Sequence, residues 1–223
     1  MRNIKIIAVL CFCLACFAAC QKTGAPSEWS KDSGWFSGST AEKPKLAEIS
    51  SAEIRKLLES AEKQTEITKS YDPVYTQIPY PNGDVPPEKG VCTDVVIRAF
   101  RNAGIDLQKE VHEDMTANFA LYPQKWNLAK PDTNIDHRRV PNLQTFFTRR
   151  GKSLPVTAKA EDYKPGDIVS WDLDGRGMTH IGIVSNFFNE ATQKYSIIHN
   201  IGGGAVREDC LFNWKITGHY RYF

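Results

Sequence analysis

The 223-residue chain lacks the features that would place it among nucleic-acid-binding or membrane-spanning proteins. Its 28 basic and 26 acidic residues give a formal net charge of only +2, and no basic patch argues for a nucleic-acid partner. After the N-terminal 20 residues, no apolar run approaches the roughly 20 residues that a transmembrane helix needs. The sequence therefore favours one water-soluble domain and a tether.

Cysteine is also scarce where a folded domain would use it. Of the six cysteines, four lie within the first 20 residues, and only Cys92 and Cys210 remain after them. Two cysteines are too few for a disulfide framework. They either pair with each other or act separately. We expect Cys210, beside Leu211 and Phe212, to be structural and Cys92 to be a free thiol.

The first 20 residues have the pattern of a secretory signal, with a basic start, an apolar run over residues 6–17 and small residues before Cys20. Their Ala-Ala-Cys ending resembles the bacterial lipobox. That resemblance implies that residues 1–19 are a signal peptide and that acyl chains on Cys20 form the only membrane attachment. In a Gram-negative host the same resemblance implies, from Gln21 after the lipid site, the outer membrane of the cell envelope, facing the periplasm. The alternative is an ordinary secreted protein.

Composition and periodicity divide the rest of the chain. Residues 20–47 are rich in Ser, Gly, Lys and Pro and are predicted to be a flexible tether. Residues 48–223 are predicted to form the domain. A capping-box pattern at residues 50–53 indicates a first helix that ends near Lys63.

A second helix is predicted to start at Cys92, because apolar residues recur at helical spacing until Gly104. Residues 105–136 show a mixed pattern that is partly loop, and a short helix is expected over residues 141–150. Four β-rich segments follow, separated by glycine turns: residues 167–171, 179–185, 195–200 and 215–222. Helices followed by a strand meander predict an α+β domain with an antiparallel sheet.

Cys92 combines two properties of a reactive thiol. At a helix N-terminus, unpaired backbone N–H groups and the helix dipole favour the thiolate over the thiol. The same N–H groups can stabilise the oxyanion that forms when a thiolate adds to a carbonyl. Buried cysteines at helix starts are nevertheless common and inert, so position alone is only suggestive.

A histidine strand supplies the base that such a thiol needs. Alternation puts His180, Gly182 and Val184 on one face of a strand, with Ile181 and Ile183 on the other. His180 is therefore a candidate general base for Cys92. At the end of the next strand, either His199 or Asn200 can orient the His180 ring, but not both, because neighbouring residues point to opposite faces.

These residues carry a family resemblance. The segment KPGDIVSW, followed by HIGIV and a helix-start cysteine upstream, resembles the NlpC-type cell-wall peptidases of the papain-like superfamily. Residues 71–223 resemble more closely a bacterial family known as domain of unknown function 1287, through YPNGDVP, GVCTDVVIRA, DTNIDHRRVPNL, PGDIV and HNIG. The superfamily implies a papain-like fold, in which the nucleophile-bearing helix packs on an antiparallel sheet, and no metal or cofactor.

The resemblance assigns roles residue by residue. The nucleophile falls on Cys92, the base on His180 and the orienting group on His199, with Asn200 as the alternative. Tyr80 lies where these peptidases carry a tyrosine in the site. Val91-Cys92-Thr93-Asp94 departs from the usual Asp-Cys-Ser-Gly, so the substrate preference of the peptidases does not transfer.

The wide separation of Cys92 from His180 implies an insertion around residues 105–150, which contains a polar cluster. Asp136, His137 and Arg138 in this cluster are candidates for substrate binding, with an arginine clamping a carboxylate. The alternative is an internally salt-bridged loop. A metal site made from His112, Asp114, Asp136 and His137 is disfavoured, because the residues lack close ligand spacing.

Three functions follow from the sequence. The first is an envelope cysteine hydrolase that cleaves amide bonds in peptidoglycan or other peptides. The second keeps the fold but performs acyl transfer or hydrolyses a lipid or ester. The third is a non-catalytic lipoprotein that binds peptidoglycan or a protein.

Overall fold

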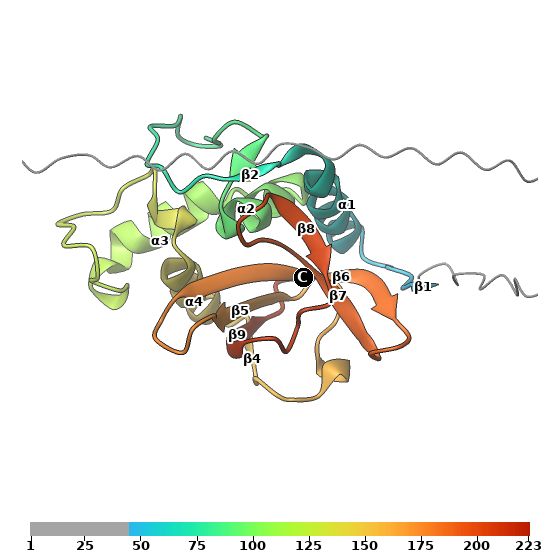
Figure 1. Cartoon of the computed structure of the whole chain (residues 1–223). Helices are drawn as coiled ribbons and strands as arrows, with labels where there is room; N and C mark the ends of the chain where they lie inside the picture. The colour runs from blue at the N-terminus through green and yellow to red at the C-terminus, as the bar shows by residue number, and fades with distance from the viewer. Residues whose placement is uncertain (1–44) are drawn as a thin grey trace, which may run out of the picture. The chain divides into compact units, whose positions relative to one another are not determined.

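The computed structural model describes residues 45–223, in which helices pack on one face of an antiparallel sheet (Figure 1). The predicted signal peptide, the lipidation site Cys20 and the tether up to residue 44 lie outside the described residues. The first strand, β1 (Lys45–Leu46), pairs with β6 (Thr179–Asn189). The last residues of the segment predicted to be tether therefore join the sheet.

The first helix, α1 (Ala52–Ile67), begins where the sequence predicted. The Ser51 side chain caps it by accepting a hydrogen bond from the Ile54 N–H at 3.2 Å. The helix continues past Lys63 because Gln64 is buried and its Nε2 donates to the Val95 carbonyl at 3.0 Å. This bond ties α1 to the next helix.

The predicted cysteine-bearing helix is confirmed as α2 (Cys92–Asn102). Val95, Val96, Ala99 and Phe100 are fully buried, as their spacing predicted. The chain leaves the helix through Gly104, whose φ of +92° lies in the left-handed region that favours glycine.

Two further helices cover the insertion. α3 (Leu107–Asn118) lies within the segment predicted to be partly loop, and the Asp106 side chain caps it by accepting from the Gln108 N–H. Its sequence, LQKEVHEDMTAN, is mostly polar, and its buried apolar stripe consists only of Leu107, Val111 and Met115. α4 (Val140–Arg149) confirms the short helix expected over residues 141–150.

The main sheet has the order β4-β9-β5-β6-β7-β8, with β1 added at β6, and all its pairings are antiparallel. Its strands besides β1 and β6 are β4 (Ser153–Leu154), β5 (Ile168–Asp172), β7 (Lys194–Asn200), β8 (Ala205–Glu208) and β9 (Lys215–Tyr220). The four predicted strands are β5, β6, β7 and β9. β8, which follows three glycines, was not predicted.

A short parallel pair, β2 (Ser70–Tyr71) and β3 (Lys89–Gly90), closes the loop that precedes Cys92. Three 3-10 helices complete the described elements: η1 (Phe119–Leu121), η2 (Asp136–Arg138) and η3 (Ala160–Asp162). Both β3 and η2 contact α2.

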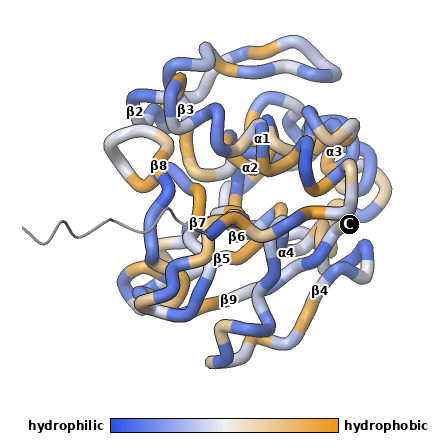
Figure 2. Tube along the Cα trace, turned by 90° about the vertical axis from the view of Figure 1, so that its right-hand side faces the viewer, coloured by the Kyte–Doolittle hydropathy of each residue, from blue (hydrophilic) through white to orange (hydrophobic). Residues whose placement is uncertain are grey.

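The sheet separates two hydrophobic clusters. The larger lies between the helices and the sheet and includes Cys92, Phe100, Ile181 and Ile183. The smaller lies on the other face and includes Tyr163, Val169, Trp171, Val184, Ile197, Cys210 and Leu211. In Figure 2, hydrophobic stretches recur along α2 and along β5 and β6.

The fold class predicted from the sequence is confirmed. A helix that begins with Cys92 packs on an antiparallel sheet whose strand β6 carries His180, which is the arrangement that the family resemblance implied. Among the residues described, no helix has the length and apolar character needed to cross a membrane.

Candidate functional site at the start of helix α2

The Cys92 sulfur is enclosed by the first turn of α2 and by strand β6. Cys92 is only 4% exposed, and burial raises the pKa of its thiol to about 12. The N–H groups of Ile181, Thr93 and Cys92 itself act in the opposite direction, while the Asp94 carboxylate raises the pKa further. At neutral pH the free protein therefore holds a protonated thiol beside donors that favour negative charge.

A buried ion pair anchors this turn. Asp94 accepts the Val91 N–H at 2.6 Å, which caps the helix. The Arg138 guanidinium binds the same carboxylate in a bidentate manner, with Nε–Oδ1 and Nη2–Oδ2 both 2.9 Å. The Thr93 hydroxyl also donates to the Arg138 carbonyl at 3.0 Å. The start of α2 is thus fastened to η2 from the insertion.

The two histidines that the sequence placed on neighbouring strands are in direct contact. His180 Nε2 lies 2.7 Å from His199 Nδ1, and His199 Nε2 lies 3.1 Å from a Glu208 carboxylate oxygen. Trp171 and Trp214 pack beside the His180 ring. Burial, and then the neighbouring His199, lower the pKa of His180 to about 3, so its imidazole is neutral at pH 7.

The Cys92 sulfur and the His180 ring lie on opposite faces of the sheet, near the start of β6. The sulfur contacts the N–H of Ile181, the residue that follows His180. Ile181 packs in the helix-side cluster, whereas the His180 ring lies against the tryptophans of the second face. Within residues 45–223 no hydrogen bond joins the Cys92 sulfur to His180. With Nε2 directed at His199, Nδ1 is the ring nitrogen left for a thiol.

A cleft of about 370 Å³ opens onto Cys92. Three basic side chains, Lys125, Arg138 and Arg139, line it, and none of its lining residues is acidic. Asp94 neutralises Arg138, and Asp136 binds Arg139 at 3.1 Å. Lys125 has no ion pair within the described part of the chain and is exposed. The cleft therefore presents an uncompensated positive charge near the thiol.

Aromatic and hydroxyl groups complete the cleft walls. The Arg139 guanidinium lies over the Trp126 ring, 4.0 Å from its centroid. Tyr71 and Thr179 also line the cleft. Burial, followed by the neighbouring Cys92 and the Asp94 carboxylate, raises the pKa of Tyr71 to about 12, so this phenol stays protonated and can donate a hydrogen bond.

The remaining residues predicted for the site lie elsewhere or are engaged internally. Tyr80 packs edge-on against His112, with ring centroids 5.1 Å apart, and is not among the residues that line the cleft. His137 is 2% exposed and does not line the cleft either. Arg138 lines the cleft and is paired with Asp94, and Asp136 is paired with Arg139. These ion pairs agree with the internally salt-bridged loop, the alternative considered from the sequence.

Of the two candidates for orienting His180, only His199 contacts its ring. Asn200 points to the helix side, where its Nδ2 donates to the carbonyls of Gly90 at 3.0 Å and Ser70 at 3.3 Å. It therefore holds the β2–β3 pair just before Cys92. Cys92 and Cys210 are both free thiols, so the disulfide considered from the sequence is absent.

Several residues of the site escaped the sequence reasoning. Asp94, Lys125 and Trp126 carry no motif that marks them, although Asp94 occupies the position of a helix-capping carboxylate. Glu208 ends the unpredicted strand β8 and Cys210 follows it, so their proximity to His199 could not be predicted. Burial, and then Glu208, raise the pKa of Cys210 to about 12.

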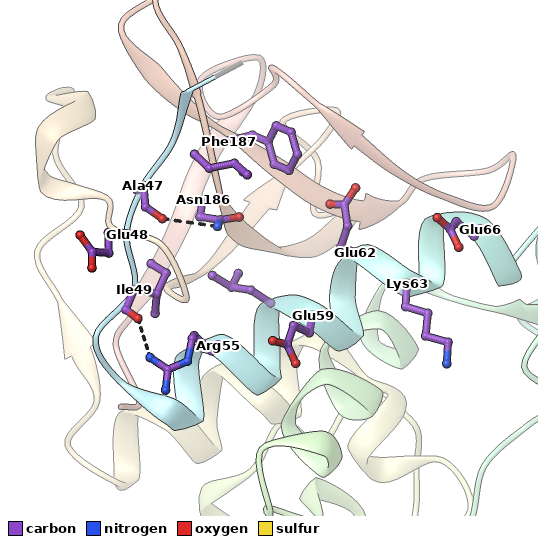
Figure 3. Close-up of a pocket in the computed structure, with 12 residues that line it drawn as sticks. Ala47, Glu48, Ile49, Arg55, Glu59, Glu62, Lys63, Glu66, Asn186 and Phe187 are labelled. Atoms are coloured by element: carbon purple, nitrogen blue, oxygen red, sulfur yellow. Dashed lines mark hydrogen bonds between the residues drawn. The ribbon is translucent and has the colours of Figure 1, made fainter. Parts of the chain in front are cut away.

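A larger cavity, of about 720 Å³, lies between α1, residues 46–49 and β6 (Figure 3). Its lining combines apolar side chains such as Leu58 and Phe187 with the acidic Glu48, Glu59, Glu62 and Glu66. It contains no cysteine or histidine, so the chemistry of nucleophile and base directs attention to the Cys92 cleft instead.

Comparisons with known proteins agree with the predicted family. The model of the family described as Domain of unknown function (DUF1287) matches residues 58–222. The chain is 54% identical over 186 residues to a protein of Escherichia coli (strain K12) described as uncharacterized protein YijF, a match that covers 83% of this chain and 89% of that protein. A solved structure of NlpC1 from Trichomonas vaginalis is similar at a TM-score of 0.42 and 13% identity, over 81% of this chain. This similarity spans about half, 48%, of the NlpC1 chain.

Proposed function

This chain belongs to the family described as Domain of unknown function (DUF1287), and we propose that it is a bacterial envelope cysteine hydrolase that cleaves amide bonds in peptidoglycan peptides. The observation that carries the proposal is the position of Cys92. Its sulfur lies at the start of a helix, among three backbone N–H groups, and borders a cleft that is lined by basic residues.

The proposed reaction begins with a neutral thiol and a neutral imidazole. As the Cys92 sulfur attacks the substrate carbonyl carbon, its proton passes to His180 Nδ1, and the His180 Nε2–H is held by His199 Nδ1. The N–H groups near the sulfur stabilise the oxyanion. The His180 proton then leaves with the amine, and water, deprotonated by the same ring, releases the acid and regenerates the thiol. The His180 ring lies on the sheet face opposite Cys92 and does not line the cleft, so this step requires the first residues of β6 to turn the ring towards the sulfur when substrate binds.

The charge of the cleft supports a peptide with free carboxylates. Lys125 supplies a positive charge that no described side chain neutralises, while Arg139 and Trp126 form a flat cationic surface. Peptidoglycan stem peptides carry carboxylates along a short chain, which suits this lining. This choice separates the proposal from hydrolysis of a neutral lipid or ester.

Cleavage of purified muropeptides, followed by mass spectrometry of the products, tests the proposal. Wild-type protein is expected to release peptide fragments, and Cys92→Ala and His180→Ala are expected to abolish release. Val96→Ala is the matched control, because it removes buried atoms from the same helix without touching the cleft. Release by Cys92→Ala at the wild-type rate would rule out Cys92 as the nucleophile.

One observation favours a second candidate, the non-catalytic peptidoglycan-binding lipoprotein. Burial keeps the Cys92 thiol and the His180 ring neutral, and no hydrogen bond joins them within residues 45–223. A binding protein would retain wild-type affinity for muropeptides in the Cys92→Ala variant and would release no fragments. Calorimetric titration of both proteins with the same muropeptides separates the two candidates.

We also propose that acyl chains on Cys20 anchor the protein in the outer membrane, facing the periplasm. The support is the lipobox-like end of the N-terminal apolar segment. Radiolabelled palmitate should enter the wild-type protein and not Cys20→Ala when both are produced in a Gram-negative host. Equal labelling of the two proteins would contradict the anchor at Cys20.

A further inference from the structure

Three potential metal ligands meet on the sheet face opposite the helices. His199 Nε2 lies 3.1 Å from Glu208 Oε2 and 3.7 Å from Cys210 Sγ. The three donor atoms all lie within 4.8 Å of one another. From this geometry we propose that His199, Glu208 and Cys210 form a binding site for Zn²⁺.

The donor set and its spacing suit zinc. Imidazole nitrogen, carboxylate oxygen and thiolate sulfur are the three side-chain ligand types that Zn²⁺ takes, and a tetrahedral ion holds its nitrogen and sulfur ligands about 3.5 Å apart. The observed nitrogen–sulfur separation of 3.7 Å requires little movement. One carboxylate and one thiolate also balance the charge of the ion. Binding would expel the thiol proton to solvent.

Rigid elements hold the three ligands. His199 lies on β7 and Glu208 on the neighbouring β8, which pair in register through His199 and Val206. Cys210 follows β8 directly and packs in the second hydrophobic cluster. The Glu208 side chain is 50% exposed, so solvent reaches the cluster from this side. It provides a route for the ion and a water for the fourth ligand position.

The second nitrogen of the ligand histidine is already oriented. Metal-bound histidines use their other ring nitrogen in a hydrogen bond that fixes the ring, and His199 Nδ1 makes such a bond with His180 Nε2 at 2.7 Å. The adjacent carboxylate, Asp209, is occupied by Lys194, Thr192 and Asn189. It therefore does not compete for the ion.

Zinc binding and the proposed catalysis require different tautomers of His180 and His199, a consequence that rests on the proposed function. Catalysis requires His180 Nε2 to donate to His199 Nδ1. Metal on His199 Nε2 leaves the proton on His199 Nδ1, which then donates to His180 Nε2 and places the His180 proton on Nδ1. The zinc-bound protein would thus lack a base for Cys92.

Cobalt absorption tests the site independently of any hydrolysis. Co²⁺ added to the purified full chain is expected to give a thiolate-to-metal charge-transfer band that Zn²⁺ removes by displacement. Cys210→Ser should lose the band, and Cys92→Ser, the same change at the other free buried thiol, should retain it. Circular dichroism of each variant verifies the fold.

A second variant keeps the test decisive if Cys210→Ser fails to fold. Glu208→Gln changes a half-exposed side chain and is expected to lower the Zn²⁺ affinity at least about tenfold, measured by calorimetry. The proposal is overturned if wild-type protein gives no charge-transfer band, if Cys210→Ser keeps it, or if Glu208→Gln binds Zn²⁺ as tightly as wild type. Loss of muropeptide cleavage alone has no bearing on these readouts.

Discussion

Replacing Arg138 with methionine should destabilise the protein far more than the same change at a surface arginine. Arg138 and Asp94 have side chains that are 2% and 4% exposed, and their two hydrogen bonds are both 2.9 Å. Removing the guanidinium leaves the Asp94 carboxylate buried with only the Val91 N–H as a close donor. Breaking a buried pair in this way costs about 3–5 kcal/mol.

Arg150→Met provides the matched control. Arg150 binds Glu110 at 3.0 Å, but both side chains are well exposed, at 42% and 35%, so its loss is expected to cost at most about 1 kcal/mol. Urea unfolding at pH 7, followed by tryptophan fluorescence, gives both free energies of unfolding. Adding Asp94→Asn to Arg138→Met should restore part of the loss, because it removes the unpaired charge. Equal destabilisation by Arg138→Met and Arg150→Met would refute this account.

Three further predictions concern the cleft, the sheet and pH. Lys125→Gln is expected to raise the KM for carboxylate-bearing muropeptides about tenfold with little change in kcat, since it removes one charged contact; steady-state kinetics would refute this if kcat fell instead. Gly182→Ala would place a Cβ 2.8 Å from Ile197 Cγ2 and 3.1 Å from His199 Cβ, so urea unfolding should show a loss of about 1–3 kcal/mol. Burial, and then Arg138, lower the pKa of His137 to about 3. Between pH 6.5 and 3, His137 is therefore protonated in the unfolded chain and neutral in the folded chain, so the free energy of unfolding falls as pH drops from about 6.5 towards 3. His137→Gln should flatten the measured pH dependence of unfolding in that window, and an unchanged slope would contradict the assignment.

Local sequence patterns were sufficient for most of the elements. Helical spacing and Gly104 located α2 with Cys92 at its first turn, and alternation placed His180 and His199 on neighbouring strands. These patterns work because they depend on residues close in the chain. They failed for α3, whose apolar positions are few, and for β8, a four-residue strand after a glycine turn.

Contacts between distant residues could not be predicted in the same way. The sequence pattern assigns Arg138 to substrate binding, and in the structure its guanidinium borders the cleft but binds Asp94, 44 residues earlier in the chain. Both sets of partners were plausible from the sequence, because an arginine binds any well-placed carboxylate. Only the packing of η2 on the start of α2 selects between them.

The sequence by itself determined the α+β class, the helix that carries Cys92 and the strand that carries His180, because periodicity and turn residues act locally. Tertiary structure decided what surrounds them. It buries the thiol and the imidazole, which keeps both neutral, and it leaves Lys125 in the cleft without an ion pair to any residue from 45 to 223. It also brings Cys210 and Glu208 to His199, because antiparallel pairing of β7 with β8 joins residues that the glycine turn separates in the chain.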